Sequence, residues 1–481
     1  MIKKFIDKYR KMNEEVKAAF VYTVCSIIQK SLLLITTPLF TRLLTTEQYG
    51  QVTIYNSWSN FLTLFLTLFL AYGSFTTAMA KFDGQRGEYV ASINGLCTVL
   101  TIVFLIIYFP LRNLFNQVFE LPTSVVMVMV ASILFSNSTQ MWYGKERFEN
   151  GHKRVAMTTL ITTILSPLIS LVFVLLAEEK GYARIIGGAV VKISIGFVCY
   201  FYFFAKERTF FNKKFWKYAL SFNIPLLPYY LSQSIFNQSD KIMISHMQGI
   251  DKAAIYGVAY SLGLIMTFVL NSINNAYTPW FYKRIKEGNL YKNQKVSTGI
   301  ALIMALLLLG VIAAAPEIIY IMASEKYMEA IWVVPPVAMS MLLLFYTQLF
   351  VNVEFYYEEK KNLVFGTIFS AIINIVLNYL LIPVFGFVAA AYTTLLSYLL
   401  FTIMHYKMYK QLLIKYNLKD ELFNYKALIV IFVAFIGIGS VMMFLYKLII
   451  VRYILIGTAL IIALINKAKV MEFIKKIQTE K

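Results

Sequence analysis

Long apolar runs dominate this chain and constrain its fold more than any other feature. A helix needs about 20 apolar residues to cross the ~30 Å hydrocarbon core of a bilayer. Fourteen stretches meet or approach this length: 18–41, 51–80, 90–110, 122–143, 155–177, 185–205, 218–239, 253–280, 297–315, 329–351, 363–383, 388–405, 426–446 and 452–466. Because 59% of the residues are hydrophobic and only 15% are charged, the sequence predicts an all-α polytopic membrane protein of about 14 transmembrane helices.

The basic residues are distributed unevenly over the connections between these runs. One alternating set of segments, which includes both chain ends, holds 34 of the 45 Lys and Arg residues, and the other set holds 9. Since basic loops stay on the cytoplasmic side, both termini are predicted to be cytoplasmic. The formal net charge of +20 would suggest nucleic-acid binding in a polar protein, but here topology explains it, and no nucleic-acid partner is predicted.

Three landmarks recur along the chain with matching topology. They are Tyr49-Gly50 and Tyr256-Gly257, Pro110 and Pro316, and Gly181-Tyr182 and Gly386-Phe387, at offsets of 207, 206 and 205 residues. The repeat unit therefore has six spans, and because six is even, the two halves are parallel. Such repeats are typical of transporters, whose substrate sites lie between the halves near the membrane midplane.

The repeat divides the chain into predicted regions. Both ends are basic and, at the N-terminus, amphipathic, which favours a position on the inner membrane surface. The regions are an interfacial segment (1–17), an N-terminal six-helix bundle (18–205), a cytoplasmic linker (206–217), a C-terminal six-helix bundle (218–405), a second linker (406–425), two additional helices (426–466) and a basic tail (467–481).

Polar side chains lie at helical spacing in the first two spans of each half. They include Thr23, Ser26, Lys30, Thr37 and Thr41; Asn56, Asn60, Thr63 and Thr67; Gln233 and Asn237; and Thr267, Asn271, Asn274 and Thr278. One such stripe is readily explained by polar contacts between packed helices. Four stripes in symmetric positions predict a polar cavity shared by these spans.

Two lysines, Lys30 and Lys192, fall inside predicted spans, where a charge is costly and usually faces water or a partner. Arg42 and Asp240 lie at the outer ends of their spans, where an ordinary interfacial position also explains them. Cations that face a cavity suit an anionic ligand, and phosphate is the obvious candidate.

Several kinds of chemistry have no motif here. There is no GxxxxGK[ST] loop for ATP, the three histidines are far apart, and the three cysteines show no paired spacing. No outer connection exceeds about thirteen residues, which leaves no room for an outer catalytic domain. We therefore predict neither an enzyme nor a bound metal or cofactor.

Four segments resemble those of a known family. They are PLFTRLLTTEQYGQVTIYNS (38–57), ALSFNIPLLPYYLSQSIFNQSDKIMISHMQGIDKAAIYGVAYSLG (219–263), APEIIYIMASEKYMEAIWVVPPVAMS (315–340) and INIVLNYLLIPVFGFVAAAYTTLLSY (373–398). Together they resemble bacterial oligosaccharide flippases, the Wzx-like polysaccharide transporters of the multidrug, oligosaccharidyl-lipid and polysaccharide exporter (MOP) superfamily. The resemblance extends over about residues 15–405 and implies a V-shaped, MATE-like pair of six-helix bundles.

The resemblance also implies a function in the bacterial cytoplasmic membrane. By alternating access, the protein would flip a polyprenyl-pyrophosphate-linked oligosaccharide repeat unit to the outer leaflet for surface polysaccharide synthesis, such as O-antigen or capsule. Lys30, Arg42 and Lys192 would neutralise the pyrophosphate, Asn60, Asn237, Asn271 and Asn274 would bind sugar hydroxyls, and Asp240 and Glu354 are candidates for ion coupling. Membrane lipid, and possible contacts with a polysaccharide polymerase and chain-length machinery, complete the partners, and a monomer suffices.

Three alternatives stay open. A cation-coupled multidrug exporter would need a buried carboxylate, whereas the deepest charges here belong to lysines. A flippase for teichoic-acid or peptidoglycan precursors differs little in its expected sequence. A membrane polysaccharide polymerase or ligase would need a large outer loop.

Overall fold

A computed structural model describes residues 14–287, 290–417 and 421–465. Every regular element within these ranges is a helix, which confirms the predicted all-α class. Most of the predicted interfacial segment, 1–17, and all of the tail, 467–481, lie outside them. The chain forms two compact units, Met1–Ala254 and Ile255–Lys481, which we describe separately.

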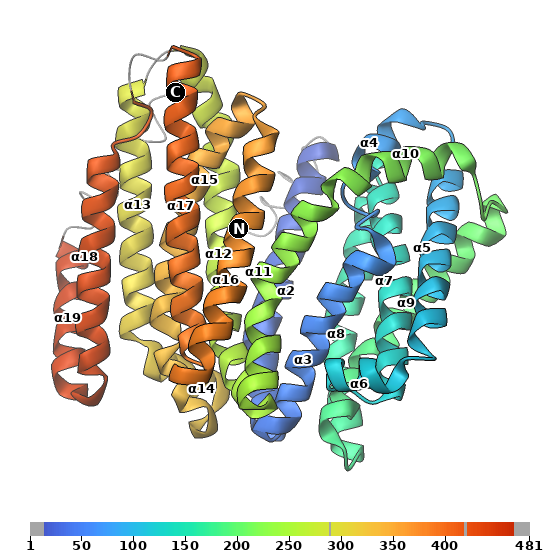
Figure 1. The fold of residues 1–481 in the computed structure, drawn as a ribbon, viewed down its shortest axis with the longest axis horizontal. Helices are drawn as coiled ribbons and strands as arrows, with labels where there is room; N and C mark the ends of the chain where they lie inside the picture. The colour runs from blue at the N-terminus through green and yellow to red at the C-terminus, as the bar shows by residue number, and fades with distance from the viewer. Residues whose placement is uncertain (1–13, 288–289, 418–420, 466–481) are drawn as a thin grey trace, which may run out of the picture. The chain divides into compact units, whose positions relative to one another are not determined.

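Helix α9 organises the first unit, because it packs against α7, α8, α3 and α5 (Figure 1). Helix α11 packs on α3, and α2 packs on α8. The elements are α2 (Glu14–Leu43), α3 (Thr46–Thr67), α4 (Phe75–Lys81), α5 (Arg86–Tyr108), α6 (Arg112–Phe119), α7 (Thr123–Phe148), α8 (His152–Leu176), α9 (Lys180–Glu207), α10 (Lys213–Asn223), η1 (Ile224–Leu226) and α11 (Leu227–Gln248).

Helix α15 is the most buried candidate span of the second unit and packs against α13, α16, α17 and α18. Helix α16 packs along α17, and α18 along α13 (Figure 1). The elements are α12 (Ile250–Glu287), which begins at the boundary, α13 (Leu290–Ala313), α14 (Ala315–Ala323), η2 (Glu325–Trp332), α15 (Val334–Tyr356), α16 (Lys360–Phe385), α17 (Ala389–Lys415), α18 (Tyr425–Phe444), η3 (Leu445–Lys447) and α19 (Ile449–Ile465).

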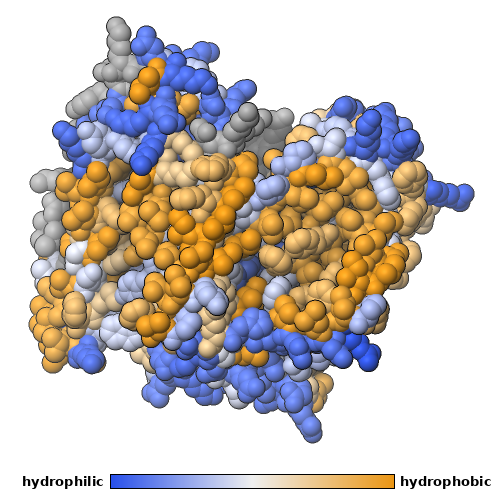
Figure 2. Space-filling view, in the orientation of Figure 1, coloured by the Kyte–Doolittle hydropathy of each residue, from blue (hydrophilic) through white to orange (hydrophobic). Residues whose placement is uncertain are grey.

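The surface is that of a membrane protein. Figure 2 shows apolar side chains along the sides of the helices and hydrophilic ones gathered toward their ends. Large apolar residues such as Leu176 and Val198 are 82% and 68% exposed, which only lipid or a partner tolerates over so wide an area. Ten helices within the described residues are long and apolar enough to cross a bilayer, and the chain is a multi-pass membrane protein.

The total of fourteen spans stays a prediction, because four expected helices are not among these ten. Helices α3, α11 and α17 carry many polar side chains, and α19 has only 17 residues. Of these polar helices, α3 lines the cavity described below, α11 packs on α3, and α17 has several buried polar side chains. Their lower hydropathy therefore reflects what they face inside the protein.

Two expected spans are interrupted, which corrects their predicted continuity. The run 51–80 breaks after α3, where Leu68 and Phe69 adopt positive φ angles of 46° and 50°, and the chain turns before α4. The run 218–239 breaks at η1, between α10 and α11, where Pro225 and Pro228 stand at helix starts. Proline lacks the N–H that would continue a helix, so it favours a new helical start here.

The order of elements repeats in a way that parallels the sequence landmarks. A short helix follows the third long helix of each half, α6 after α5 and α14 after α13, and three long helices come next each time. The compact units divide at residue 254, whereas the repeat places its boundary in 206–217. The two boundaries differ because one is defined by contacts and the other by the repeat. Helix α11 belongs to the second half by the repeat, but it packs on α3.

Candidate functional site

A polar cavity of about 260 Å³ opens within the first unit between α3, α7 and α9. We call it the α3–α7–α9 cavity. Carboxamides and hydroxyls from α3 and α7 dominate its polar lining, and Lys192 of α9 is its charged group. Its polar side chains are Tyr55, Asn56, Ser59, Asn60, Thr63, Tyr72, Ser132, Ser136, Asn137, Gln140 and Lys192.

The polar side chains of α3 can face the cavity because their donors bond to the backbone of the same helix. The Thr63 hydroxyl donates to the Ser59 carbonyl at 2.7 Å, and the Asn60 Nδ2 donates to the Asn56 carbonyl at 2.8 Å. These bonds to residue i−4 satisfy the donors without a neighbouring helix. Asn56 and Asn60 stay exposed to the cavity, and the Asn60 amide oxygen is available as an acceptor.

Small residues bring α9 close to its neighbours and so position Lys192. A Cβ on Gly187 would lie 2.6 Å from the Ser170 Cα of α8, and a Cβ on Gly196 would overlap the Phe135 carbonyl of α7. Such contacts between backbones are common in membrane helix packing. Lys192 lies one turn before Gly196, so this close packing of α9 sets where its side chain enters the cavity.

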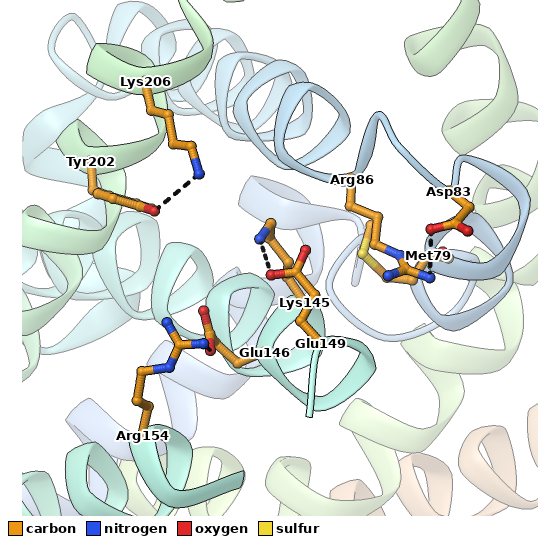
Figure 3. Close-up of polar contacts among 9 residues, drawn as sticks. All are labelled: Met79, Asp83, Arg86, Lys145, Glu146, Glu149, Arg154, Tyr202 and Lys206. Carbon is orange, nitrogen blue, oxygen red and sulfur yellow. Dashed lines mark hydrogen bonds and ion pairs between the residues drawn. The ribbon is translucent and has the colours of Figure 1, made fainter. Parts of the chain in front are cut away.

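Lys192 differs from three paired cations at the helix ends of the same unit. Arg154 pairs with Glu146 at 2.8 Å, Arg86 pairs with Asp83 at 2.9 Å, and Lys145 pairs with Glu149. Figure 3 shows these residues. Lys192 is exposed, and no ion pair or hydrogen bond joins it to another residue that the structure describes. Its ammonium group is therefore free to meet a ligand.

Arg184, two turns before Lys192 on α9, has a structural role. Its guanidinium lies 4.0 Å from the centre of the Phe40 ring of α2 and donates to the Ser170 hydroxyl of α8 at 3.0 Å. A stacked and hydrogen-bonded guanidinium ties helices together. Arg184 thus joins α2, α8 and α9, and its charge adds to the positive potential near Lys192.

The other predicted residues of the first unit lie outside the lining of this cavity. Lys30 of α2 is half-buried and makes no polar contact within the described residues, and Arg42 is exposed at the end of α2. The Asn237 Nδ2 of α11 donates to the Gln233 carbonyl at 2.8 Å, and Asp240 is buried. Of the predicted substrate residues, Asn60 and Lys192 are the two that the structure brings together.

The predicted residues Asn271 and Asn274 of the second unit accept hydrogen bonds from α15. The Asn352 Nδ2 of α15 donates to the Asn274 Oδ1 of α12 at 2.9 Å, and the Gln348 Nε2 donates to the Asn271 Oδ1 at 3.4 Å. Glu354 of α15 is fully buried. The four-stripe cavity that the sequence predicts stays a prediction, since its stripes belong to both units.

Sequence reasoning missed the contribution of α7. Ser132, Ser136, Asn137 and Gln140 occur at helical spacing and line one wall of the cavity. The run SNSTQ at 136–140, within a predicted span, was a readable signal of a polar face. Only the fold shows that α7 and α3 line the same cavity, because the two helices are far apart in sequence.

Solved structures of membrane transporters share this fold. The chain is similar to the lipid II flippase MurJ in an inward closed conformation, with a TM-score of 0.67 at 13% identity over 89% of this chain and 100% of that one. It is also similar to an inward-facing multidrug resistance MATE family transporter of the MOP superfamily, with a TM-score of 0.62 at 14% identity over 82% of this chain and 96% of that one. The chain therefore has the fold that these two transporters share.

A family model for polysaccharide biosynthesis proteins matches residues 16–285, more than half of the chain. The protein belongs to this family. It is 23% identical over 338 residues to an uncharacterized membrane protein of Methanocaldococcus jannaschii, covering 67% of this chain, and 30% identical over 77 residues to the Lsg locus putative protein 1 of Haemophilus influenzae, covering 16% of it. The chain spans 66% and 19% of the lengths of these two relatives.

Proposed function

We propose that the protein is a flippase that moves a polyprenyl-pyrophosphate-linked oligosaccharide repeat unit from the inner to the outer leaflet of the bacterial cytoplasmic membrane. The mechanism we propose is alternating access, and the product would feed surface polysaccharide synthesis. The polysaccharide biosynthesis family and the MurJ-like and MATE-like fold support a membrane exporter of this kind.

The observation that carries the proposal is the chemistry of the α3–α7–α9 cavity. It holds one ammonium group, Lys192, and no carboxylate, among several carboxamides and hydroxyls. An ammonium group binds phosphate oxygens as a point charge, while carboxamides both donate to and accept from sugar hydroxyls. This set fits a ligand that combines an anionic pyrophosphate with a sugar.

The cavity residues have distinct proposed roles. Lys192 neutralises the pyrophosphate, and Asn56, Asn60 and Gln140 hydrogen-bond the sugar while the polyprenyl chain stays in lipid. Lys30 and Arg42 of α2 supply further positive charge along the path. Neutralising the charge matters because an uncompensated anion is costly within the membrane.

Two alternatives make different demands on this cavity. A drug exporter for cations would favour a carboxylate there, and the lining has none. A flippase for teichoic-acid or peptidoglycan precursors would use the same lipid-linked pyrophosphate chemistry, so only its glycan would differ. Contacts with a polymerase or chain-length machinery are further proposals, and a monomer is sufficient for flipping.

Reconstitution tests the function directly. The purified full chain is placed in liposomes that contain polyprenyl-pyrophosphate-linked sugar with a fluorescent label, and a membrane-impermeant reductant quenches the label in the outer leaflet. We expect the quenched fraction to rise above that of protein-free liposomes. Unchanged quenching in the presence of folded protein would contradict the proposal, and dye efflux by the same liposomes would favour the drug exporter.

Gene deletion tests the biological direction. We expect cells without the gene to accumulate lipid-linked oligosaccharide in the inner leaflet and to lose surface polysaccharide. Normal surface polysaccharide in the deletion strain would rule out this assignment.

A further inference from the structure

A groove of about 560 Å³ lies between α7, α8 and α9 of the first unit, and it shares no lining residue with the α3–α7–α9 cavity. We call it the α7–α8–α9 groove. Helix α9, which packs against both α7 and α8, contributes the largest share of its lining. The lining residues are Trp142 and Glu146 of α7, Arg154, Thr158 and Ile161 of α8, and Ser194, Ile195, Val198, Cys199 and Tyr202 of α9. Its volume is typical of a ligand-binding pocket.

The chemistry of the groove changes along its helices. Arg154 lies in the first turn of α8 and Tyr202 near the end of α9, at the membrane face that the charge distribution predicts to be cytoplasmic. Thr158 follows one turn deeper on α8. Ile161 and Val198, deeper still on their helices, are exposed apolar side chains. A charged end, then hydroxyl groups, then an apolar end is the order of groups in a phospholipid, which has a phosphate, ester groups and acyl chains.

The tight turn between α7 and α8 builds the charged end of the groove. The Gly151 N–H donates to the Glu146 carbonyl at 2.7 Å, and a Cβ on Gly151 would overlap the Glu146 carboxylate. Glu146 is buried and pairs with Arg154 at 2.8 Å. Since a buried carboxylate needs a cation, this pair holds Arg154 at the groove. The Arg154 side chain is 65% exposed and makes no other polar contact within the described residues, so its guanidinium keeps donors for a ligand.

Lys206 adds a second cation at this end. It is exposed, and its ammonium group donates to the Tyr202 hydroxyl at 3.4 Å (Figure 3). No carboxylate in the part of the chain that the structure describes pairs with it. Glu149 is taken by Lys145, and the Glu207 side chain lies against α5.

The charges at this end therefore leave a surplus of one positive charge. Arg154 and Glu146 cancel, while Lys206 has no counter-charge. A zwitterionic headgroup would bring its own ammonium beside Lys206, whereas a headgroup with a net negative charge would neutralise it. Charge complementarity thus selects an anionic lipid.

We propose that the α7–α8–α9 groove binds a phospholipid with a net negative charge from the cytoplasmic leaflet. Its phosphate contacts Arg154 and Lys206, because guanidinium and ammonium groups bind phosphate oxygens well. The Thr158 and Tyr202 hydroxyls face its ester groups, and an acyl chain lies along Val198. Basic pockets between transmembrane helices on the cytoplasmic side suit such headgroups. The proposal concerns a lipid that stays bound, so it does not rest on the proposed function.

Native mass spectrometry of the full chain in detergent tests lipid binding. The probes are phosphatidylglycerol and phosphatidylethanolamine with identical acyl chains, since both have a phosphate but only the first has a net negative charge. We expect the affinity for phosphatidylglycerol to be about fivefold higher, which is the effect of one basic residue near a membrane surface. Inorganic phosphate at the same concentration should not displace the lipid, because it lacks an acyl chain.

Two variants change the groove without breaking its buried ion pair. Lys206→Gln removes the surplus charge and should abolish the preference for phosphatidylglycerol, whereas Lys213→Gln, at an exposed lysine of α10 outside the groove, should keep it. Val198→Trp fills the apolar part and should weaken binding of both lipids. Leu176→Trp, at an exposed apolar residue of α8 outside the groove, is its matched control and should bind like the natural protein.

A phosphatidylglycerol with a photoreactive diazirine in its acyl chain locates the site. We expect it to label peptides of α8 and α9 that contain Ile161 and Val198, and labelling confined to other helices would place the lipid elsewhere and overturn the proposal.

The binding data can contradict the proposal in three further ways. Equal affinities for the two lipids, or an unchanged preference in Lys206→Gln, would overturn it. Displacement by inorganic phosphate would show an anion site without a lipid. Stronger binding of polyprenyl pyrophosphate than of phosphatidylglycerol would assign the groove to the transported lipid instead. None of these measurements requires flipping, so they decide lipid binding even if the proposed function fails.

Discussion

Two sets of polar side chains within the membrane, one in each unit, are used in opposite ways. In the first unit, Asn56, Asn60 and Lys192 face a cavity and leave hydrogen-bonding capacity unused. In the second unit, Asn274 bonds Asn352, and Asn374 bonds Thr394, each across a contact between two helices. The first set therefore faces a cavity, whereas the second set joins neighbouring helices.

This difference separates two consequences of intramembrane polarity. A polar group that faces a water-filled cavity costs little stability and is available to a ligand, whereas a paired polar group specifies how helices pack. Mutations of the polar residues that face the cavity should therefore change transport more than stability, and mutations of the paired polar residues in the second unit should do the reverse. The following predictions test this contrast, from the largest expected effect to the smallest.

Removal of the Lys192 charge should have the largest effect on transport. Charge-assisted hydrogen bonds contribute about 1.5–3 kcal/mol, so we expect Lys192→Ala to slow flipping about 10- to 100-fold with little change in thermal stability. Lys192→Arg should retain most of the rate because it keeps the charge. Lys217→Ala, at an exposed lysine of α10 outside the cavity, is the matched control, and equal rates for both alanine variants would remove Lys192 from the mechanism.

A larger side chain between α9 and α7 should destabilise the packing of the first unit. A Cβ at Gly196 overlaps the Phe135 carbonyl, so Gly196→Ala should lower the free energy of unfolding by about 1–3 kcal/mol and slow flipping by displacing Lys192. Gly437→Ala on α18, where a Cβ meets no atom within 4 Å, serves as the control. Thermal melting in detergent measures the effect, and equal melting temperatures for the two variants would show that α9 can shift freely.

The paired network of the second unit should matter for stability. Asn378 accepts from the Thr393 hydroxyl and donates to the Asn374 Oδ1 at 3.3 Å, and all three side chains are buried. Asn378→Ala leaves buried polar groups unpaired and should cost about 1–3 kcal/mol of folding free energy. Asn60→Ala in the cavity should change stability by at most about 0.5 kcal/mol. A larger destabilisation by Asn60→Ala than by Asn378→Ala would break the contrast between the units.

Lys30 should show the smallest effect among the cations considered. It is half-buried on α2 and does not line the α3–α7–α9 cavity. Solvent should therefore screen its attraction to an anionic ligand. A weak exposed ion pair contributes about 0.2–1 kcal/mol, which predicts a loss of less than about fivefold for Lys30→Ala. Full flipping by Lys30→Ala would remove Lys30 from the path, whereas a loss greater than that of Lys192→Ala would reverse their ranking.

The sequence identified some residues of the candidate site but not the residues that lie beside them in the fold. Lys192 was identifiable because a lysine inside an apolar span needs an explanation, and Asn60 belonged to a visible polar stripe. The same argument identified Lys30, and only the fold shows that Lys192 lines the cavity while Lys30 does not. The sequence also missed His405, whose Nδ1 lies 2.7 Å from the Glu354 Oε1, because no neighbour in sequence marks it as the partner of Glu354.

Hydrophobicity along the chain was enough to determine that this protein is helical and spans a membrane many times, and the charge distribution predicts that its basic segments lie mainly on one side. These properties depend on local composition, because a bilayer selects every span by its own apolar length. Tertiary structure alone decided which polar faces meet. Periodicity identifies a polar face on α3 or α17, but only packing shows that the first borders a cavity beside Lys192 and that the second holds His405 against Glu354.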